Sequence, residues 1–374
     1  VGAHVGSRSQ TFLLPLRLVP NRARKNGARG WLYIRYKHTS WSCSSGRQPL
    51  YAQANHDCES YQSLAVSHEN RHIVRGPPLV IAFALYCKSY RVDVKRAKRL
   101  ALTVEKYNVD KIPFYISCPQ ADLPIFREYL SGLSVKLITD EEIILSNPVH
   151  SLDKVNAIPG HLSQQIIKSE FWRLGLAEAY LCLDSDCQFI RPFHLSEFLD
   201  TSDTPYTVVD ECREILLPAA SLRKQKVIDN FYKESVQVQR AFERAGKHYN
   251  FGPNCPVWHR DVWMSLDENF IKPRDTSFAQ LIVEHPIEMR WYGEALLKYG
   301  AIKLLPSQPF FKMYAYAWQL RRDRAEGLVE EDLAQFYCGV TYQSAWEREM
   351  DWPSEGGNLA SRLGRRLRRS LGRT

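Results

Sequence analysis

Two aspartates one residue apart, Asp184 and Asp186, follow an apolar run in the stretch YLCLDSDCQFI. Residues i and i+2 of a β-strand project to the same side, so both carboxylates are expected to face one object. Two adjacent like charges resist burial unless a cation or hydrogen-bond donors offset them. Mg²⁺ or Mn²⁺ does this, since such ions usually bind one or two carboxylates while ligand phosphates and water complete the shell. The pair therefore predicts a metal that holds a diphosphate; the alternative is a solvated strand end or a cap on the next helix.

A polar face on the preceding helix supports this hypothesis. Gln164 and Lys168 are four residues apart in HLSQQIIKSEFW and share one side of a helix, with Gln165 beside them. A lysine in this position is suited to neutralise phosphate oxygens opposite the aspartates. The alternative is a solvated helix surface.

These residues need elements that position them, and strand and helix patterns alternate along the chain from Leu79 onward. Apolar runs predict strands, and the amphipathic segments between them predict helices. The predicted strands are 79–87, 111–119, 135–139, the YLCLDSD run, 206–211 and 301–311, and the predicted helices are 91–107, 120–132, 160–180, 220–247, 275–284 and 287–299. This order predicts an α/β domain with a mainly parallel sheet, whose ligand crevice lies beyond the carboxyl ends of the strands.

Taken in order, these motifs resemble those of GT-A nucleotide-sugar glycosyltransferases. An apolar strand, a loop with Ser89, Tyr90 and Asp93, a G-x-x-x-Q-Q-x-x-K helix ending at Lys168, the L-D-S-D strand and a G-P-x-x-P-V-W loop follow one another. The resemblance covers residues 79–315 and is strongest to an uncharacterised bacterial branch. It implies a GT-A, Rossmann-like fold, with a mixed, mainly parallel sheet flanked by helices in a single domain with disordered ends.

The resemblance also implies roles for single residues. Asp184 and Asp186 form a D-x-D motif that contacts the metal and the ribose or diphosphate of the donor. Tyr90 stacks on the nucleotide base and Asp93 accepts from a ring N–H, although Asp93 is equally suited to cap the helix that follows. The metal and Lys168 stabilise the charge that develops on the leaving phosphate.

An inverting enzyme of this kind needs a carboxylate or a histidine that takes the proton of the acceptor hydroxyl. Glu294 in WYGEALLKYG is the first candidate, because the family often has an acid before a Tyr-Gly pair in this region. Asp210 and His259 are the next candidates, together with Glu211 and Asp261. Each of them has the alternative of a surface acid or a hydrogen-bonded loop residue.

The segment 250–263 is predicted to be a loop that combines small polar and aromatic residues. Asn250 and Gly252 suit contacts with sugar hydroxyls, and Trp258 suits stacking on the apolar face of a sugar. A place in the core is the alternative for Trp258 and the favoured interpretation for Trp263.

The net charge of +9 is concentrated at the two ends of the 374-residue chain. Residues 1–78 carry +8 and residues 357–374 carry +6, which leaves −5 between them. The first segment lacks periodicity, so we predict a poorly ordered extension that need not be native to the domain. A helical region is predicted for 316–356. In 357–374, leucines recur every fourth residue among six arginines, which predicts an amphipathic tail on an anionic membrane surface; a disordered or nucleic-acid-binding tail is the alternative.

Nine scattered cysteines without C-x₂-C spacing indicate a reducing compartment, and no apolar run reaches the roughly 18 residues of a membrane span. We therefore expect a cytoplasmic enzyme, peripheral on the inner face of the cell membrane. Its expected partners are a nucleotide-sugar donor and a saccharide or lipid-linked acceptor, with no specific nucleic acid.

Two other functions stay open on the sequence. One is a non-catalytic GT-A-like binding module, docked by its basic tail to a membrane or nucleic acid. The other is a phosphatase of the haloacid dehalogenase type, which also uses an Asp-x-Asp at a strand end. Such phosphatases need Thr or Val two positions after the second Asp, where this chain has Gln188.

Overall fold

A five-stranded sheet organises the computed structural model, which describes residues 81–252 and 255–343. The strands, in spatial order, are β3 (Val135–Thr139), β2 (Phe114–Cys118), β1 (Ile81–Lys88), β4 (Ala177–Asp184) and β7 (Val257–His259). The first four are parallel and β7 pairs antiparallel with β4. The predicted α/β class with a mainly parallel sheet is therefore confirmed. The predicted segments 1–78 and 357–374 lie outside the described residues.

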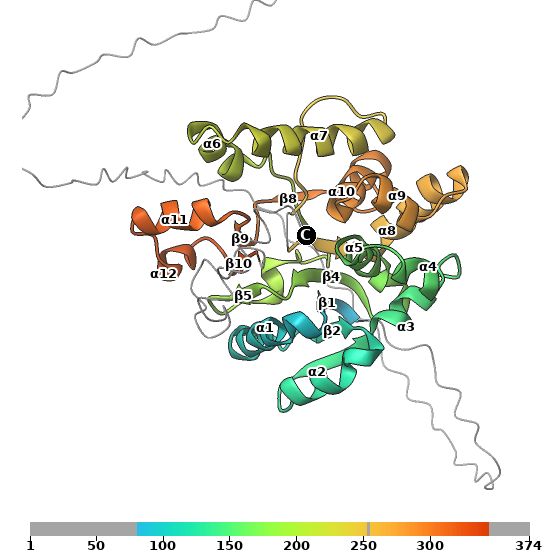
Figure 1. Cartoon of the computed structure of the whole chain (residues 1–374), viewed down its shortest axis with the longest axis horizontal. Helices are drawn as coiled ribbons and strands as arrows, with labels where there is room; N and C mark the ends of the chain where they lie inside the picture. Colours follow the sequence, from blue (N-terminus) through green and yellow to red (C-terminus); the bar gives the residue numbers. More distant parts are fainter. Residues whose placement is uncertain (1–80, 253–254, 344–374) are drawn as a thin grey trace, which may run out of the picture. The chain divides into compact units, whose positions relative to one another are not determined.

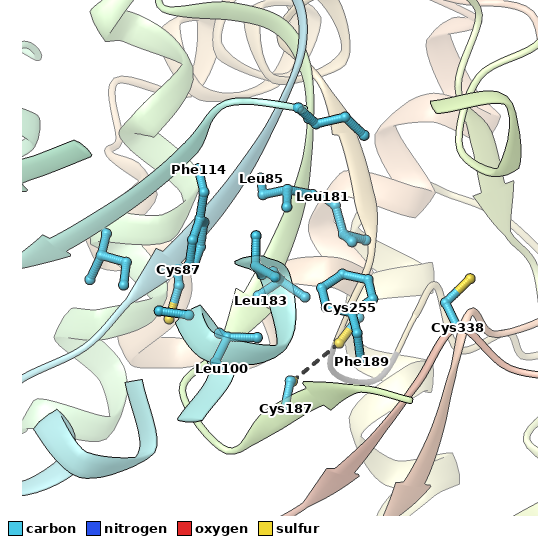
Figure 2. Close-up of a cluster of buried hydrophobic side chains, with 14 of the residues drawn as sticks. Leu85, Cys87, Leu100, Phe114, Leu181, Leu183, Cys187, Phe189, Cys255 and Cys338 are labelled. Carbon is cyan, nitrogen blue, oxygen red and sulfur yellow. Dashed lines mark hydrogen bonds between the residues drawn. The ribbon is translucent and has the colours of Figure 1, made fainter. Parts of the chain in front are cut away.

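Strand β1 occupies the middle of this sheet, which explains its continuous apolar sequence. Phe83 and Leu85 face one hydrophobic cluster, whereas Ala84 and Tyr86 face a second cluster on the other side. Figure 2 shows part of the first cluster, including Leu85 and Leu181 of the neighbouring β4. A central parallel strand needs apolar residues in both directions because helices cover both faces of the sheet.

The helices form two groups, one for each face (Figure 1). α1 (Val94–Tyr107) and α2 (Leu123–Tyr129) send their buried residues into the first cluster. The second cluster receives side chains from α3 (Asp140–Leu145), α4 (Leu152–Asn156), α5 (Gly160–Glu170), α7 (Gln225–Ala241), α8 (Arg260–Leu266), α9 (Phe278–Glu284) and α10 (Glu288–Tyr299). α6 (Arg213–Ser221) packs on α7, and α7 packs on α10.

Two small sheets complete the described part of the fold. β5 (Cys187–Phe189), β10 (Gly339–Tyr342) and β9 (Phe311–Tyr314) form one, and β6 (Tyr206–Val208) pairs with β8 (Leu305–Ser307) in the other. α11 (Ala317–Ala325) and α12 (Glu330–Leu333) lie between β9 and β10, so the described part of the predicted helical region 316–356 also contains a strand. Among the described helices, none has both the length and the apolar character to span a membrane.

The helix predicted over 160–180 is too long. α5 ends at Glu170, a short 3₁₀ turn follows, and Gly175 adopts the left-handed conformation with φ of 62°. Residues 177–180 belong instead to β4, where they pair with β1. The sheet partner outweighs the local helical pattern here, because pairing satisfies the backbone groups of a segment that is buried on both faces.

The segment 250–263, predicted as a loop, contains all of β7 and the start of α8. Val257 pairs with Leu181, which places this short segment at the edge of the main sheet. Its glycine and prolines indicated a loop, but they precede the strand and do not interrupt it.

Candidate active site

Asp184 is the last residue of β4 and stands at the edge where the parallel strands end. It lies opposite Lys88, the last residue of β1, in the register of the sheet. Ser185 and Asp186 form a turn, and β5 begins at Cys187. The expectation that Asp184 and Asp186 share one side of a single strand is therefore wrong, because the chain turns between them; Asp184 is partly exposed and Asp186 is buried.

Lys168 of α5 lies between two carboxylates. Its Nζ is 2.5 Å from Oδ1 of Asp184 and 3.5 Å from Oε1 of Glu288, the first residue of α10. The side chains of Lys168 and Glu288 are only 8% and 6% exposed, whereas that of Asp184 is 34% exposed. This cluster therefore joins the edge of the sheet to two helices and opens toward solvent at Asp184.

The two buried members of the cluster have shifted pKa values. Burial alone lowers the pKa of Lys168, but the charges of Asp184 and Glu288 outweigh it, so the pKa lies well above its ordinary value. Burial raises the pKa of Glu288, and the nearby Lys168 only partly offsets this. Lys168 thus stays cationic, and Glu288 is a carboxylate that binds a proton more readily than an exposed one.

The backbone just before Glu288 adopts an unusual conformation. Ile287 has φ of 94° and ψ of 84°, in the left-handed region that β-branched residues rarely adopt. Its N–H donates to Oε1 of Gln165 at 2.7 Å, although the two residues are 122 positions apart. Strain of this kind persists only where surrounding contacts impose it, and it often marks a functional site. Here Gln165 holds the start of α10 against α5.

A pocket of about 550 Å³ lies beside this cluster. Five of the predicted site residues line it: Gln164, Gln165, Lys168, Asp184 and Asn250. α10 contributes Glu288 and Arg290, and the remaining lining is largely apolar and aromatic, including Phe231, Met313 and Tyr316. A pocket of this volume, lined both by apolar side chains and by convergent polar groups, suits a small polar ligand.

Tyr90 and Asp93 follow β1 at the same edge, but they do not line this pocket. Tyr90 is 43% exposed, with Nζ of Lys88 6.0 Å from the centre of its ring. The carboxylate of Asp93 pairs with Arg96 and does not cap α1. Burial raises the pKa of Asp93 against the opposing charge of Arg96, and the charge of Asp184 also contributes to the rise. The charge of Asp184 therefore acts both on the Lys168 cluster and on Asp93.

Comparison with known families identifies the domain. A model described as "Family of unknown function (DUF6492)" matches residues 78–304. The chain belongs to this family. No curated protein matches the chain. The family match ends before β8, so it includes the whole main sheet and the Lys168 cluster of this DUF6492 chain.

Solved structures similar to the DUF6492 chain include three glycosyltransferases. They are mouse xyloside xylosyltransferase 1 in its apo form (8% identity, TM-score 0.41, 70% of this chain and 98% of that one), the galactosyltransferase LgtC with donor and acceptor sugar analogues (13%, 0.37, 70% and 87%), and the apo WbbM bifunctional glycosyltransferase (12%, 0.41, 72% and 47%). At these scores the similarity is general, and it assigns neither a substrate nor residue roles to this chain.

The catalytic residues predicted for the DUF6492 chain lie apart from its pocket. Glu294 is buried, and its two carboxylate oxygens accept from Nε and Nη2 of Arg244 at 2.5 and 2.6 Å. His259 pairs with Ala179 in the sheet, five residues before Asp184, which corresponds to roughly 16 Å along the strand. Asp210 bridges Asn250 through backbone hydrogen bonds of 3.1 and 2.7 Å, and its side chain lines a neighbouring cavity of about 810 Å³.

The reserve acids and the loop residues also have identified surroundings. Glu211 pairs with Lys247 and Arg213, and the N–H of Asp261 donates to Nδ1 of His259. Trp258 is completely buried against Tyr180 and Trp263, so it occupies the core position that was its alternative and does not line the pocket. Gly252 has φ of 94°, and a side chain there would meet Pro256 at 3.0 Å, so its role in this structure is in the backbone.

The aspartates of the DUF6492 chain supply a donor set for one type of metal. Among the described residues, no group of three or more His, Cys, Asp and Glu side chains is arranged to hold an ion. Two carboxylates at the end of a strand suit Mg²⁺ or Mn²⁺, which commonly takes its other ligands from phosphates and water. They do not suit a structural zinc site, which needs four protein ligands.

Glu288 and Arg290 of α10 are two charged pocket residues that sequence reasoning missed. A usable signal for Glu288 was present, because Glu288 stands four residues before Tyr292-Gly293, the same kind of pattern that selected Glu294 before Tyr299 and Gly300. For Arg290 the local sequence held no such signal, since its burial depends on α7.

Proposed function

We propose that this protein is a metal-dependent glycosyltransferase that moves a sugar from a nucleoside diphosphate sugar to a saccharide or lipid-linked acceptor. The observation that carries the proposal is the Lys168 cluster: a buried cation shared by Asp184 and Glu288, at the carboxyl edge of a parallel sheet and open to a pocket of about 550 Å³. Ligands of α/β sheets bind at this edge, and the volume suits a sugar with part of its leaving group.

In this proposal the diphosphate lies at the turn between β4 and β5. Asp184 and Asp186 hold Mg²⁺ or Mn²⁺, which supplies charge stabilisation to the leaving phosphate when it is bound. Lys168 contacts Asp184 already and remains cationic, so it is placed to neutralise phosphate oxygens at the same turn. Tyr90 and Asp93 follow β1, the strand next to β4 in the sheet. They are assigned to the base and ribose of the nucleotide.

Glu288 is assigned as the base that takes the proton of the acceptor hydroxyl. Burial raises the pKa of two pocket carboxylates, Glu288 and Glu234, and Glu288 is the one beside Lys168 and Asp184; general bases act best when their pKa lies near the working pH. Glu294 is a weaker candidate, because both of its oxygens are occupied by Arg244. Removal of the acceptor proton by Glu288 as the sugar leaves the phosphate corresponds to a reaction with inversion of configuration.

The first test is calorimetric titration of the full chain with UDP and with GDP, each with and without Mn²⁺. Asp186→Ala is the informative variant, and Asp153→Ala, an exposed residue on α4, is its matched control. We expect one nucleotide to bind only with Mn²⁺, with affinity at least tenfold weaker in Asp186→Ala and unchanged in Asp153→Ala. Binding without metal, or equal binding by the two variants, contradicts the assigned donor site.

A second measurement separates an enzyme from a binding module. The nucleotide sugar that matches the bound nucleotide is incubated with the protein and Mn²⁺, and release of free nucleotide is followed. Release that depends on the protein and on metal supports transferase chemistry, since water replaces the acceptor. Tight binding with no release from any donor sugar, even with added saccharides, favours the module.

A further inference from the structure

A buried arginine in the pocket carries an inference that goes beyond the proposed reaction. Arg290 lies in the first turn of α10, is 4% exposed and lines the pocket. Its guanidinium stands 5.0 Å from the centre of the Phe231 ring on α7. A buried arginine is costly unless its donors are paired, so its hydrogen bonds indicate what the site is built to hold.

The donors of Arg290 are largely unused. Nε and Nη1 are both buried without a hydrogen-bond partner among the described residues. Nη2 is 3.7 Å from Oε2 of Glu234, which is too long for a hydrogen bond, and the Glu234 side chain is 44% exposed. Burial lowers the pKa of Arg290, and the charges of Glu234 and Glu294 only partly compensate. The guanidinium is therefore a desolvated cation whose charge is incompletely balanced.

The position of Arg290 separates it from the phosphate end of the pocket. Residues two apart on a helix point about 200° from each other, so Glu288 and Arg290 face different neighbours. Glu288 meets Lys168 on α5, whereas Arg290 meets Phe231 and Glu234 on α7. An anion at Arg290 would therefore lie on the α7 side of the pocket, whereas Lys168 and Asp184 would contact the diphosphate on the α5 side.

We propose that Arg290 binds an oxyanion of the transferred sugar or of the acceptor, so that the enzyme acts on an acidic saccharide. A carboxylate or a phosphate matches the planar fork of a guanidinium, with Nε and Nη1 donating to it. The inference rests on the proposed function. It narrows the class of saccharide on which the enzyme acts to sugars that carry a carboxylate or a phosphate.

The test is calorimetric titration of the full chain with glucuronate, glucose 6-phosphate and glucose, in the presence of Mn²⁺ and the nucleotide that binds. We expect one of the two anionic sugars to bind at least tenfold more tightly than glucose; which one it is separates carboxylate from phosphate recognition. Arg290→Gln should lose this preference, and Arg240→Gln, an exposed arginine on α7, should keep it. Equal binding of all three sugars, or a preference that survives in Arg290→Gln, overturns the proposal.

A second variant keeps the test decisive if Arg290→Gln folds poorly. Glu234→Gln leaves the guanidinium in place and removes the nearest competing carboxylate, so the anionic sugar should bind several-fold more tightly. Unchanged or weaker binding contradicts the site. Nucleotide titration of the same samples keeps the two proposals apart: nucleotide binding without anion preference leaves the glycosyltransferase proposal intact, and anion preference without nucleotide binding leaves only the anion site.

Discussion

A single lysine between two carboxylates determines much of the chemistry available to this pocket. Lys168 lies closer to Asp184 than to Glu288, at 2.5 against 3.5 Å, and Asp184 is the more exposed partner. A diphosphate with its metal at Asp184 would attract Lys168 further away from Glu288. The charge of Lys168 lowers the pKa of Glu288 and the charge of Asp184 raises it, so the occupancy of this corner sets how readily Glu288 takes a proton.

The first prediction at this scale concerns Glu288→Gln. We expect transfer, or donor hydrolysis with water as the acceptor, to slow by about 10²- to 10⁴-fold, since this is the usual contribution of a positioned base. Nucleotide affinity should stay within threefold of the original, because the variant keeps the shape of the side chain. Initial rates at saturating donor measure the first effect and calorimetry the second. Half of the original rate remaining in the variant would exclude Glu288 as the base.

The pH dependence provides a separate prediction for the same residue. The basic form of Glu288 is the active one, so the rate should rise as pH increases through a pKa above the ordinary 4.5. The same rise of the rate with pH should be seen in Glu326→Gln, which changes an exposed glutamate on the surface. A rate at saturating donor that stays flat from pH 4.5 to pH 7 argues for another base.

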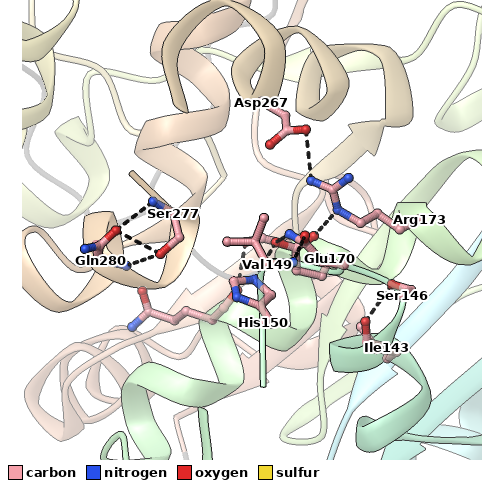
Figure 3. Close-up of polar contacts among 12 residues, drawn as sticks. Ile143, Ser146, Val149, His150, Glu170, Arg173, Asp267, Ser277 and Gln280 are labelled. Atoms are coloured by element: carbon pink, nitrogen blue, oxygen red, sulfur yellow. Dashed lines mark hydrogen bonds and ion pairs between the residues drawn. The ribbon is translucent and has the colours of Figure 1, made fainter. Parts of the chain in front are cut away.

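At the scale of elements, the helix that carries Lys168 is fixed at its C-terminal end by buried polar contacts (Figure 3). Glu170 accepts from Nδ2 of Asn147 and from Nε2 of His150, both at 2.9 Å, and pairs with Arg173. Arg173 also lies 3.2 Å from Asp267, in the segment after α8. The end of α5 is thereby held to the loop between α3 and α4 and to the α8 region.

We predict that Glu170→Gln destabilises the fold by about 1 to 3 kcal/mol, because it removes the buried charge that accepts hydrogen bonds from Asn147 and His150 and pairs with Arg173, which keeps Asp267 as a partner. Burial raises the pKa of Glu170, but the hydrogen bond from His150 and the charge of Arg173 outweigh it, so the pKa lies below 4.5. This charge therefore stabilises the fold above about pH 4.5, and its contribution is lost as pH falls through the lowered pKa.

Denaturant unfolding at pH 7 and at pH 4 measures both effects. The original protein should lose more stability between these two pH values than Glu170→Gln does. Glu326→Gln, an exposed control, should behave as the original. If Glu170→Gln shows the same stability as the original at pH 7, these contacts are not what fixes α5.

Elements set by nearby residues were predictable from the sequence, and those set by distant partners were not. The predicted strand 135–139 coincides with β3, and the predicted helix 287–299 differs from α10 by one residue, because an apolar pattern defines each locally and Gly300 ends α10. The start of β4 was missed since its pairing with β1 decides it. β7 was missed for a similar reason, because β4 supplies its only described pairing.

The candidate site follows the same division. Asp184 and Lys168 are close in the chain, and their side chains meet as the L-D-S-D and Q-Q-x-x-K motifs suggested. Glu288 is 120 residues from Lys168, and no local pattern reports that two helices so far apart will meet. The choice of Glu294 failed to place an acid in the pocket because the charge that it neutralises, on Arg244, comes from a loop 50 residues earlier.

At the scale of the whole molecule, we propose that the segment 357–374, which lies outside the described residues, binds an anionic membrane surface. Each of its six arginines is worth about 1 kcal/mol near an anionic membrane. We predict that replacing all six by Gln lowers binding to phosphatidylserine vesicles at least tenfold, and that 0.5 M salt does the same to the original. Sedimentation with phosphatidylcholine vesicles is the control; equal binding of both proteins to the anionic vesicles would exclude this tail as the anchor.

The central place of β1 has a consequence for synthesis on the ribosome. β1 ends at Lys88, but its partner β4 begins only at Ala177. At translation rates of roughly 5 to 20 residues per second, the backbone edge of β1 that pairs with β4 waits roughly 4 to 18 s for its partner. During that interval the nascent chain presents a strand edge on which other chains can pair. We therefore expect slower elongation between these two strands to lengthen the time during which that edge is open to other chains.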